Sequence, residues 1–157
     1  MADHTETLQL DFDPNQISYG ELLRIFWVEH RPLHQPWSRQ YMSAIFCGNE
    51  VQLEVAGRIK NEFEARWDAT VYTEVRLEKD FYRAEDYHQK YRLQRFESIM
   101  NDLKQYYPRF DDLVDSPTAT RLNAFLGGAL SKTKLPAEME VFGLSPQSTA
   151  ILKKTAR

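Results

Sequence analysis

The sequence has little cysteine and little glycine. Of its 157 residues, one is cysteine and six are glycine. A single cysteine excludes a disulfide within the chain and a metal cluster held by several thiolates. The sequence contains no glycine-rich phosphate loop, no Walker sequence and no GxSxG elbow. The usual signals for phosphate binding and for a serine nucleophile are therefore missing.

Long apolar runs and clusters of basic residues are also missing. No apolar stretch approaches the roughly 18 residues that a membrane span needs. The net charge is −3, and no run of Lys or Arg indicates nucleic-acid binding. The opening residues, MADHTETL, are too polar for a signal peptide and lack the arginines of a transit peptide. We therefore expect a cytoplasmic protein that binds neither a membrane nor nucleic acid.

Three segments are typical of β-strands. Residues 3–12, DHTETLQLDF, alternate with period two and predict a strand whose apolar face begins at Glu6. Residues 40–47, QYMSAIFC, are apolar on both faces and predict a strand buried on both sides. Residues 70–77, TVYTEVRL, predict a half-exposed strand.

Helices are predicted between and after these strands. Ser18 and Glu21 have the spacing of a capping box, and Asn49 can cap a second helix. A long helix is predicted from about residue 84 to residue 106. Ser116 with Pro117, and Ser145 with Pro146, predict two short helices near the C-terminus.

This order predicts an α/β or α+β fold, a sheet flanked by helices. Because only short helices are predicted after Pro108, we expect a main domain over residues 1–107. Residues 108–157 are expected to form a helical C-terminal extension packed on that domain. A chain of 157 residues can bury roughly 70% of its unfolded surface, enough for a substantial core.

The signals for metal binding and for a nucleophile are weak. His30 and His34 are four residues apart, but Pro32 argues against one helix carrying both. Glu85 and His88 have the spacing of half a di-iron site, and no second half can be placed. Solvated loop and helix residues are the favoured interpretation, so no metal ligand is assigned. Cys47 could be a nucleophile, but a small buried apolar residue is the favoured interpretation.

The loop HQPWSRQY directly precedes the second predicted strand, where loops often build sites. It concentrates His34, Trp37, Arg39 and Tyr41. Trp37 and Arg39 are candidate substrate-binding residues. The alternative is structural, with Trp37 filling the core and Arg39 a surface charge.

Several stretches together resemble the peptide-methionine (S)-S-oxide reductases, the A-type methionine sulfoxide reductases. The matching stretches lie in family order over about residues 3–91, and the most specific are AEDYHQKY and QYMSAI. The others are DHTETLQLDFDP, ISYGELLRIFWVEHRP and VYTEV. The resemblance implies an α/β fold of that family and an oxidoreductase that repairs oxidised methionine in peptides and proteins.

The resemblance also implies roles for two residues. Glu6 in DHTE matches the family's acid, which protonates the sulfoxide oxygen, and Tyr41 in QYMS matches a tyrosine that hydrogen-bonds that oxygen. Burial of Glu6 in the predicted strand would raise its pKa, as a general acid requires. Thioredoxin or a dithiol would be the reductant, with no bound cofactor.

The chain departs from the family pattern at the nucleophile. The family's GCFWG segment with its nucleophilic cysteine, a GYAGG-like stretch, an aspartate and the recycling cysteines have no match here. Cys47 does not align with the nucleophile, so none is assigned. Three interpretations follow, in decreasing order: a truncated form of an active reductase, a short inactive isoform that binds oxidised peptides or a partner, and an enzyme in which Cys47 attacks sulfur.

The unmatched segment supplies a strand and a helix in the family. We therefore expect exposed apolar side chains, including Leu8, Leu10 and Phe12, and an unpaired sheet edge. The isolated chain is expected to be unstable, to aggregate, or to need a partner or a second copy of itself.

Overall fold

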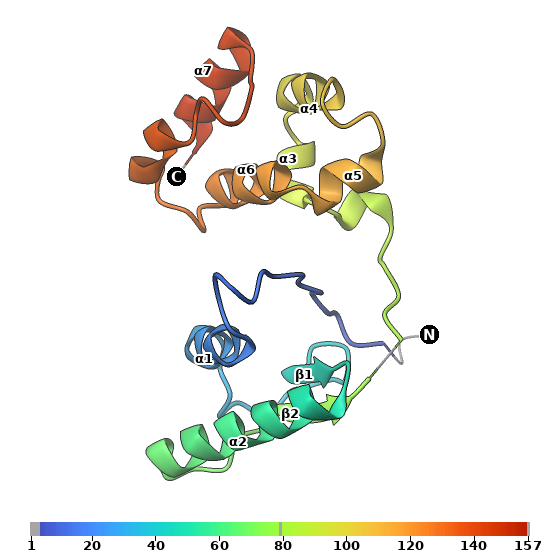
Figure 1. The fold of residues 1–157 in the computed structure, drawn as a ribbon, viewed down its shortest axis with the longest axis vertical. Helices are drawn as coiled ribbons and strands as arrows, with labels where there is room; N and C mark the ends of the chain where they lie inside the picture. Colours follow the sequence, from blue (N-terminus) through green and yellow to red (C-terminus); the bar gives the residue numbers. More distant parts are fainter. Residues whose placement is uncertain (1–3, 79, 157) are drawn as a thin grey trace. The chain divides into compact units, whose positions relative to one another are not determined.

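The computed structural model describes residues 4–78 and 80–156. The chain divides into two compact units, residues 1–82 and residues 83–157. Each unit is described by itself (Figure 1). The domain boundary expected after residue 107 lies within the second unit and stays a prediction. Among the described residues, no helix is both long and apolar enough to cross a membrane.

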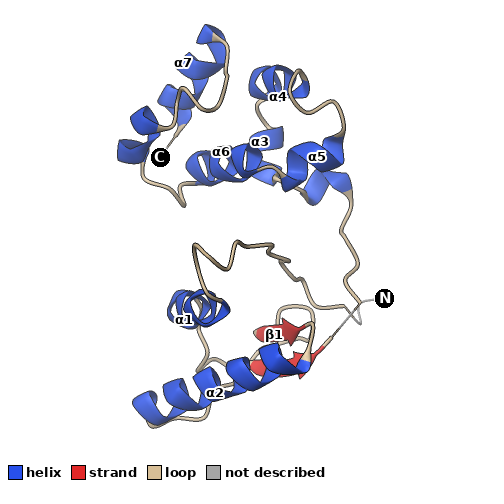
Figure 2. Ribbon diagram, viewed as in Figure 1, coloured by secondary structure: helices blue, strands red, loops and turns tan. Residues whose placement is uncertain are grey.

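Unit 1, residues 1–82, is a strand–helix–strand unit with one additional helix. Its elements are α1 (Tyr19–Glu29), β1 (Ala44–Cys47), α2 (Glu50–Trp67) and β2 (Glu74–Leu77). The strands are parallel, with Ala44 opposite Glu74 and Cys47 opposite Leu77. Parallel strands need a crossover connection, which α2 supplies while packing against both (Figure 2). The predicted α/β class is confirmed.

Local sequence signals set the helix ends in unit 1. The Ser18 hydroxyl accepts the Glu21 backbone N–H, and the Glu21 carboxylate accepts the Ser18 N–H, so the predicted capping box is confirmed. The Asn49 side chain accepts the Gln52 N–H at the start of α2. Buried residues from all parts of the unit form one core: Leu23, Trp27, Ile45, Cys47, Ala56, Ile59, Phe63 and Val71.

The strand predicted over residues 3–12 is wrong for the described residues 4–12, which contain no strand. A strand forms only where a neighbour pairs with its backbone, and here a single backbone hydrogen bond, from the Glu6 N–H to the Gln40 carbonyl, joins this segment to the rest of the unit. Leu8 is 79% exposed and Leu10 is 60% exposed, as expected for an unpaired apolar segment. Phe12, which was also expected to be exposed, is instead partly buried and stacks on Tyr19, with 6.5 Å between the ring centroids.

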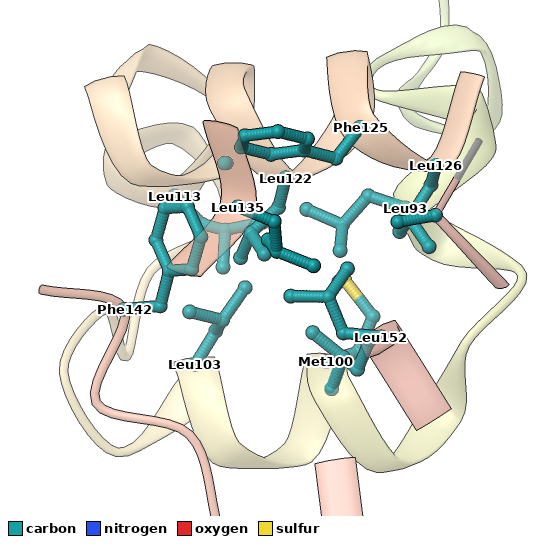
Figure 3. Packing of buried hydrophobic residues seen from close by; sticks show 13 residues of the cluster. Leu93, Met100, Leu103, Leu113, Leu122, Phe125, Leu126, Leu135, Phe142 and Leu152 are labelled. Carbon is teal, nitrogen blue, oxygen red and sulfur yellow. The ribbon is translucent and has the colours of Figure 1, made fainter. Parts of the chain in front are cut away.

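Unit 2, residues 83–157, is helical in its described part. Its elements are η1 (Asp86–His88), α3 (Tyr91–Gln94), α4 (Glu97–Lys104), α5 (Phe110–Asp115), α6 (Pro117–Gly127), η2 (Lys132–Ala137) and α7 (Pro146–Thr155), where η denotes a 3₁₀-helix. Ser116 and Ser145 cap α6 and α7, each followed by proline, as predicted. Side chains from several of these helices converge on one core, which Figure 3 shows.

The long helix predicted over residues 84–106 is wrong. The segment is broken into η1, α3 and α4, and Lys90 adopts a left-handed conformation with φ 48°. Side chains satisfy the backbone at the breaks: the Asn123 Oδ1 accepts the N–H groups of Arg92 and Leu93 at 3.0 and 3.1 Å. The sequence does have the apolar period of a helix. In the folded unit, however, the Asn123 side chain accepts the backbone N–H groups that carbonyls of a continuous helix would accept.

Candidate functional site

A turn over residues 39–42 meets the N-terminal segment of unit 1. The turn is closed by the Met42 N–H, which donates to the Arg39 carbonyl at 3.4 Å. Two bonds dock the segment on this turn: the Thr5 hydroxyl donates to the Arg39 carbonyl at 3.1 Å, and the Glu6 N–H donates to the Gln40 carbonyl at 2.9 Å. The turn thus brings Glu6 beside residues 34 positions away in the sequence.

The Glu6 side chain is also held by this turn. The Gln40 Nε2 donates a hydrogen bond of 2.9 Å to the Glu6 Oε1. Glu6 itself is exposed, so the expected burial among apolar side chains is wrong. The burial was inferred from a strand that the segment does not form. The carboxylate is instead positioned by a polar side chain at the surface.

Tyr41, the second candidate catalytic residue, follows Gln40 in the same turn. Its ring stacks on Trp37 with 4.8 Å between the ring centroids and 28° between the ring planes. Trp37 is 81% exposed and Tyr41 is 47% exposed, so Trp37 does not fill the core, and that structural alternative is wrong. Arg39 is exposed as well. The structure therefore brings Glu6, Trp37, Arg39 and Tyr41 into one surface region.

Cys47 lies elsewhere in unit 1, on β1, and is completely buried. The Tyr19 hydroxyl oxygen lies 3.6 Å from its Sγ atom. Burial raises the pKa of the Cys47 thiol above its ordinary value. A buried thiol that stays protonated at neutral pH is a poor nucleophile, because the thiolate is the attacking species. This environment favours the interpretation of Cys47 as a core residue.

His30 has a structural environment that accounts for both ring nitrogens. Its Nδ1 lies 2.6 Å from the Phe26 carbonyl oxygen, which can only accept, so Nδ1 carries the hydrogen. Its Nε2 lies 2.8 Å from the hydroxyl of the buried Thr73. Burial lowers the pKa of His30. These bonds join the end of α1 to the segment leading into β2.

The other metal candidates are also placed by the structure. His34 is exposed, and the His88 Nε2 lies 3.8 Å from a Glu85 carboxylate oxygen at the surface. Over residues 4–78 and 80–156, no group of three or more His, Cys, Asp or Glu side chains is arranged to hold a metal ion.

The sequence of this chain matches a known protein family over most of its length. The family model described as "Peptide methionine sulfoxide reductase" matches residues 1–112. The chain belongs to the peptide methionine sulfoxide reductase family, so the resemblance inferred from the sequence is confirmed. The match includes Glu6 and the whole turn over residues 39–42.

Individual relatives show how far the similarity extends. A peptide methionine sulfoxide reductase of Drosophila melanogaster is 42% identical over 148 residues, 93% of this chain and 59% of the relative. One from Methanococcoides burtonii is 39% identical over 95 residues, 56% of this chain and 62% of the relative. The chain thus spans about three fifths of the length of these two relatives. Because it covers 93% of the chain, the Drosophila match extends past residue 112, further into unit 2 than the family model does.

Gln40 is a candidate functional residue that the motif analysis missed. It bonds Glu6 through both its backbone carbonyl and its side chain. Its position directly before Tyr41 in the matching QYMS stretch was the available signal. Nothing in the spacing of residues 6 and 40 could show that they meet, because that contact depends on the fold of the unit.

Proposed function

We propose that this chain takes part in the reduction of methionine-S-sulfoxide to methionine in peptides and proteins. Glu6 protonates the sulfoxide oxygen, and the Tyr41 hydroxyl donates a hydrogen bond to it. Family membership supports this proposal. The observation that carries it is the docking of Thr5 and Glu6 on the turn over residues 39–42, because that docking puts both oxygen-binding groups on one surface.

The reaction requires a thiolate besides these residues. The thiolate attacks the sulfoxide sulfur, the sulfur–oxygen bond breaks, and the oxygen takes a proton from Glu6 and ends as a sulfenic acid on the attacking cysteine. Methionine is released as a thioether. A second thiol then condenses with the sulfenic acid to a disulfide and water, and thioredoxin or a dithiol returns the disulfide to thiols. Thiols supply both electrons, so the step needs no bound cofactor.

Cys47 is not assigned as the nucleophile. It is buried, and its thiol has a raised pKa beside Tyr19. The proposed role of the described residues is therefore to bind and protonate the sulfoxide oxygen. The burial of Cys47 favours a second candidate function, a module that binds oxidised methionine peptides without turnover.

Peptide binding and turnover test the proposal together. A fluorescent peptide with methionine-S-sulfoxide is titrated with the chain, beside the same peptide with methionine or methionine-R-sulfoxide. We expect preference for the S-sulfoxide, and we expect Glu6→Leu and Tyr41→Phe each to weaken it by about threefold to tenfold, the value of one hydrogen bond. Equal binding of the three peptides would contradict the proposal.

Turnover is then followed in dithiothreitol for the chain and for Cys47→Ser. We expect the two proteins to release methionine at the same rate, whether or not that rate exceeds the rate in buffer. Methionine formation that Cys47→Ser abolishes would identify Cys47 as the nucleophile and overturn the assignment made here. Sulfoxide-specific binding with no turnover would favour the binding module.

A further inference from the structure

Gln40 forms two hydrogen bonds with Glu6, one through its backbone and one through its side chain. Its carbonyl accepts the Glu6 backbone N–H at 2.9 Å, and its side-chain Nε2 donates to the Glu6 Oε1, also at 2.9 Å. The first bond fixes the backbone of the N-terminal segment. The second fixes the rotation of the carboxyl group. Only the second bond depends on which side chain stands at position 40.

The orientation matters because a carboxylic acid donates its proton from one oxygen. An amide N–H that donates to Oε1 makes that oxygen an acceptor, so the acid proton is left to Oε2. An exposed glutamate without such a bond samples several rotamers. The half-buried Gln40 restricts this freedom, and it sits next to Tyr41 in one turn.

We propose that Gln40 is a positioning residue for sulfoxide recognition, which orients the Glu6 carboxyl so that Oε2 faces the sulfoxide oxygen. This inference rests on the proposed function, since it assigns Glu6 the role of acid. It predicts that the turn over residues 39–42 supplies two functions at once. Tyr41 contacts the oxygen, and Gln40 acts through Glu6.

Nuclear magnetic resonance tests the contact without any substrate. The side-chain amide signals of Gln40 and Gln35 are compared between the unsubstituted chain and Glu6→Leu, which removes the acceptor of the Gln40 bond. We expect the Gln40 signal to differ between the two proteins and the exposed Gln35 signal of the same loop to stay nearly constant. A Gln40 signal that is the same in both proteins would overturn the proposal.

Peptide binding then tests the role. Gln40→Met keeps the length of the side chain and the backbone bond but removes the donor, and Gln35→Met is its matched control. We expect Gln40→Met to reduce the preference for the S-sulfoxide peptide over the methionine peptide by about threefold to tenfold, with methionine-peptide binding unchanged. Gln35→Met should change neither. An unaltered preference in Gln40→Met would overturn the positioning role.

The two readouts separate this inference from the proposed function. If the Gln40 signal depends on Glu6 but the unsubstituted chain shows no sulfoxide preference, the proposed function fails, and the role of Gln40 in sulfoxide recognition falls with it. If the preference exists and depends on Glu6 but not on Gln40, the positioning role alone fails.

Discussion

The two units of the chain differ in the size of their cores and in how much of each is helix or strand. Among the described residues, the core of unit 2 contains thirteen buried apolar side chains and that of unit 1 contains eight, although the units are of similar length. Unit 1 also keeps long segments outside helices and strands, including residues 4–17 and 31–43. Unit 2 is therefore expected to be the more stable of the two.

The difference follows from how each element is specified. A capped helix forms its backbone hydrogen bonds within one short stretch, as α6 and α7 do in unit 2. A parallel strand forms them only with a distant segment, as β1 does with β2. The candidate site lies in unit 1 and is held together by contacts between residues far apart in the sequence. Its geometry therefore depends on the unit that is expected to be the less stable.

The largest expected effect is the loss of Trp27. It is completely buried and lies 5.5 Å from Phe63 between ring centroids. We expect Trp27→Ala to lower the free energy of unfolding of unit 1 by about 3–5 kcal/mol, enough to unfold it. Hydrogen exchange should then lose protection over residues 44–77 and keep it over residues 97–127. The exposed Trp37, as Trp37→Ala, is the matched control and should leave both regions protected. Equal loss in both units would contradict the expectation that Trp27 stabilises unit 1 in particular.

The corresponding change in unit 2 is Leu122→Ala. Leu122 lies on α6 and is completely buried in the core (Figure 3). We expect a loss of about 3 kcal/mol from the removed methyl groups and the cavity. Because unit 2 begins with the larger core, protection over residues 97–127 should fall without disappearing. Leu10→Ala, at a side chain that is 60% exposed, is the control. Complete unfolding of unit 2 by Leu122→Ala would reverse the order of stability argued here.

Helix caps give a smaller effect that compares the units directly. The Ser116 hydroxyl is buried, accepts the Ala119 N–H at 3.0 Å and donates to the Leu113 carbonyl at 2.8 Å. Ser18 caps α1 at an exposed position. We expect Ser116→Ala to cost about 1–2 kcal/mol and Ser18→Ala about 0.5–1 kcal/mol in urea unfolding. Ser116→Thr, which keeps the hydroxyl, should recover most of the loss. A larger loss of unfolding free energy in Ser18→Ala than in Ser116→Ala would contradict this prediction.

The same contrast decides how much of the fold could be predicted from the sequence. The helix starts at Ser18, Asn49, Ser116 and Ser145 were predictable, because a cap is a signal contained in four residues. The strand over residues 3–12 and the helix over residues 84–106 were wrong, because periodicity records which side chains are apolar but not which partner their backbone finds. That helix is interrupted at Lys90, which is left-handed, and the Asn123 side chain bonds the backbone just after it; no local pattern contains either feature.

The residues of the candidate site were proposed from the sequence, and their roles stay predictions; the contacts between them could not be predicted. The resemblance singled out Glu6 and Tyr41, and the loop composition singled out Trp37 and Arg39. The burial of Glu6 was wrong because it was inferred from the strand. The contact with Gln40 could not be found, because it joins positions that only the fold brings together.

The smallest expected effect is a pH dependence confined to unit 1. Burial lowers the pKa of His30 in the folded protein from its ordinary value of 6.5. The unfolded chain therefore binds a proton at His30 at a higher pH than the folded chain does. The stabilisation is complete above pH 6.5 and is lost as the pH falls from there towards the folded pKa. Protection over residues 44–77 should thus decrease in this window, while residues 97–127 stay unchanged.

Two variants test whether the pH dependence arises from His30. His30→Asn retains an amide that can donate to the Phe26 carbonyl but has no titrating ring, so the pH dependence should disappear. His34→Gln changes an exposed histidine of the same segment and should leave the dependence intact. If His34→Gln removes the dependence and His30→Asn preserves it, then the buried link between α1 and Thr73 is not what makes unit 1 sensitive to acid. If residues 97–127 lose protection over the same pH window, the contrast between the units does not extend to acid.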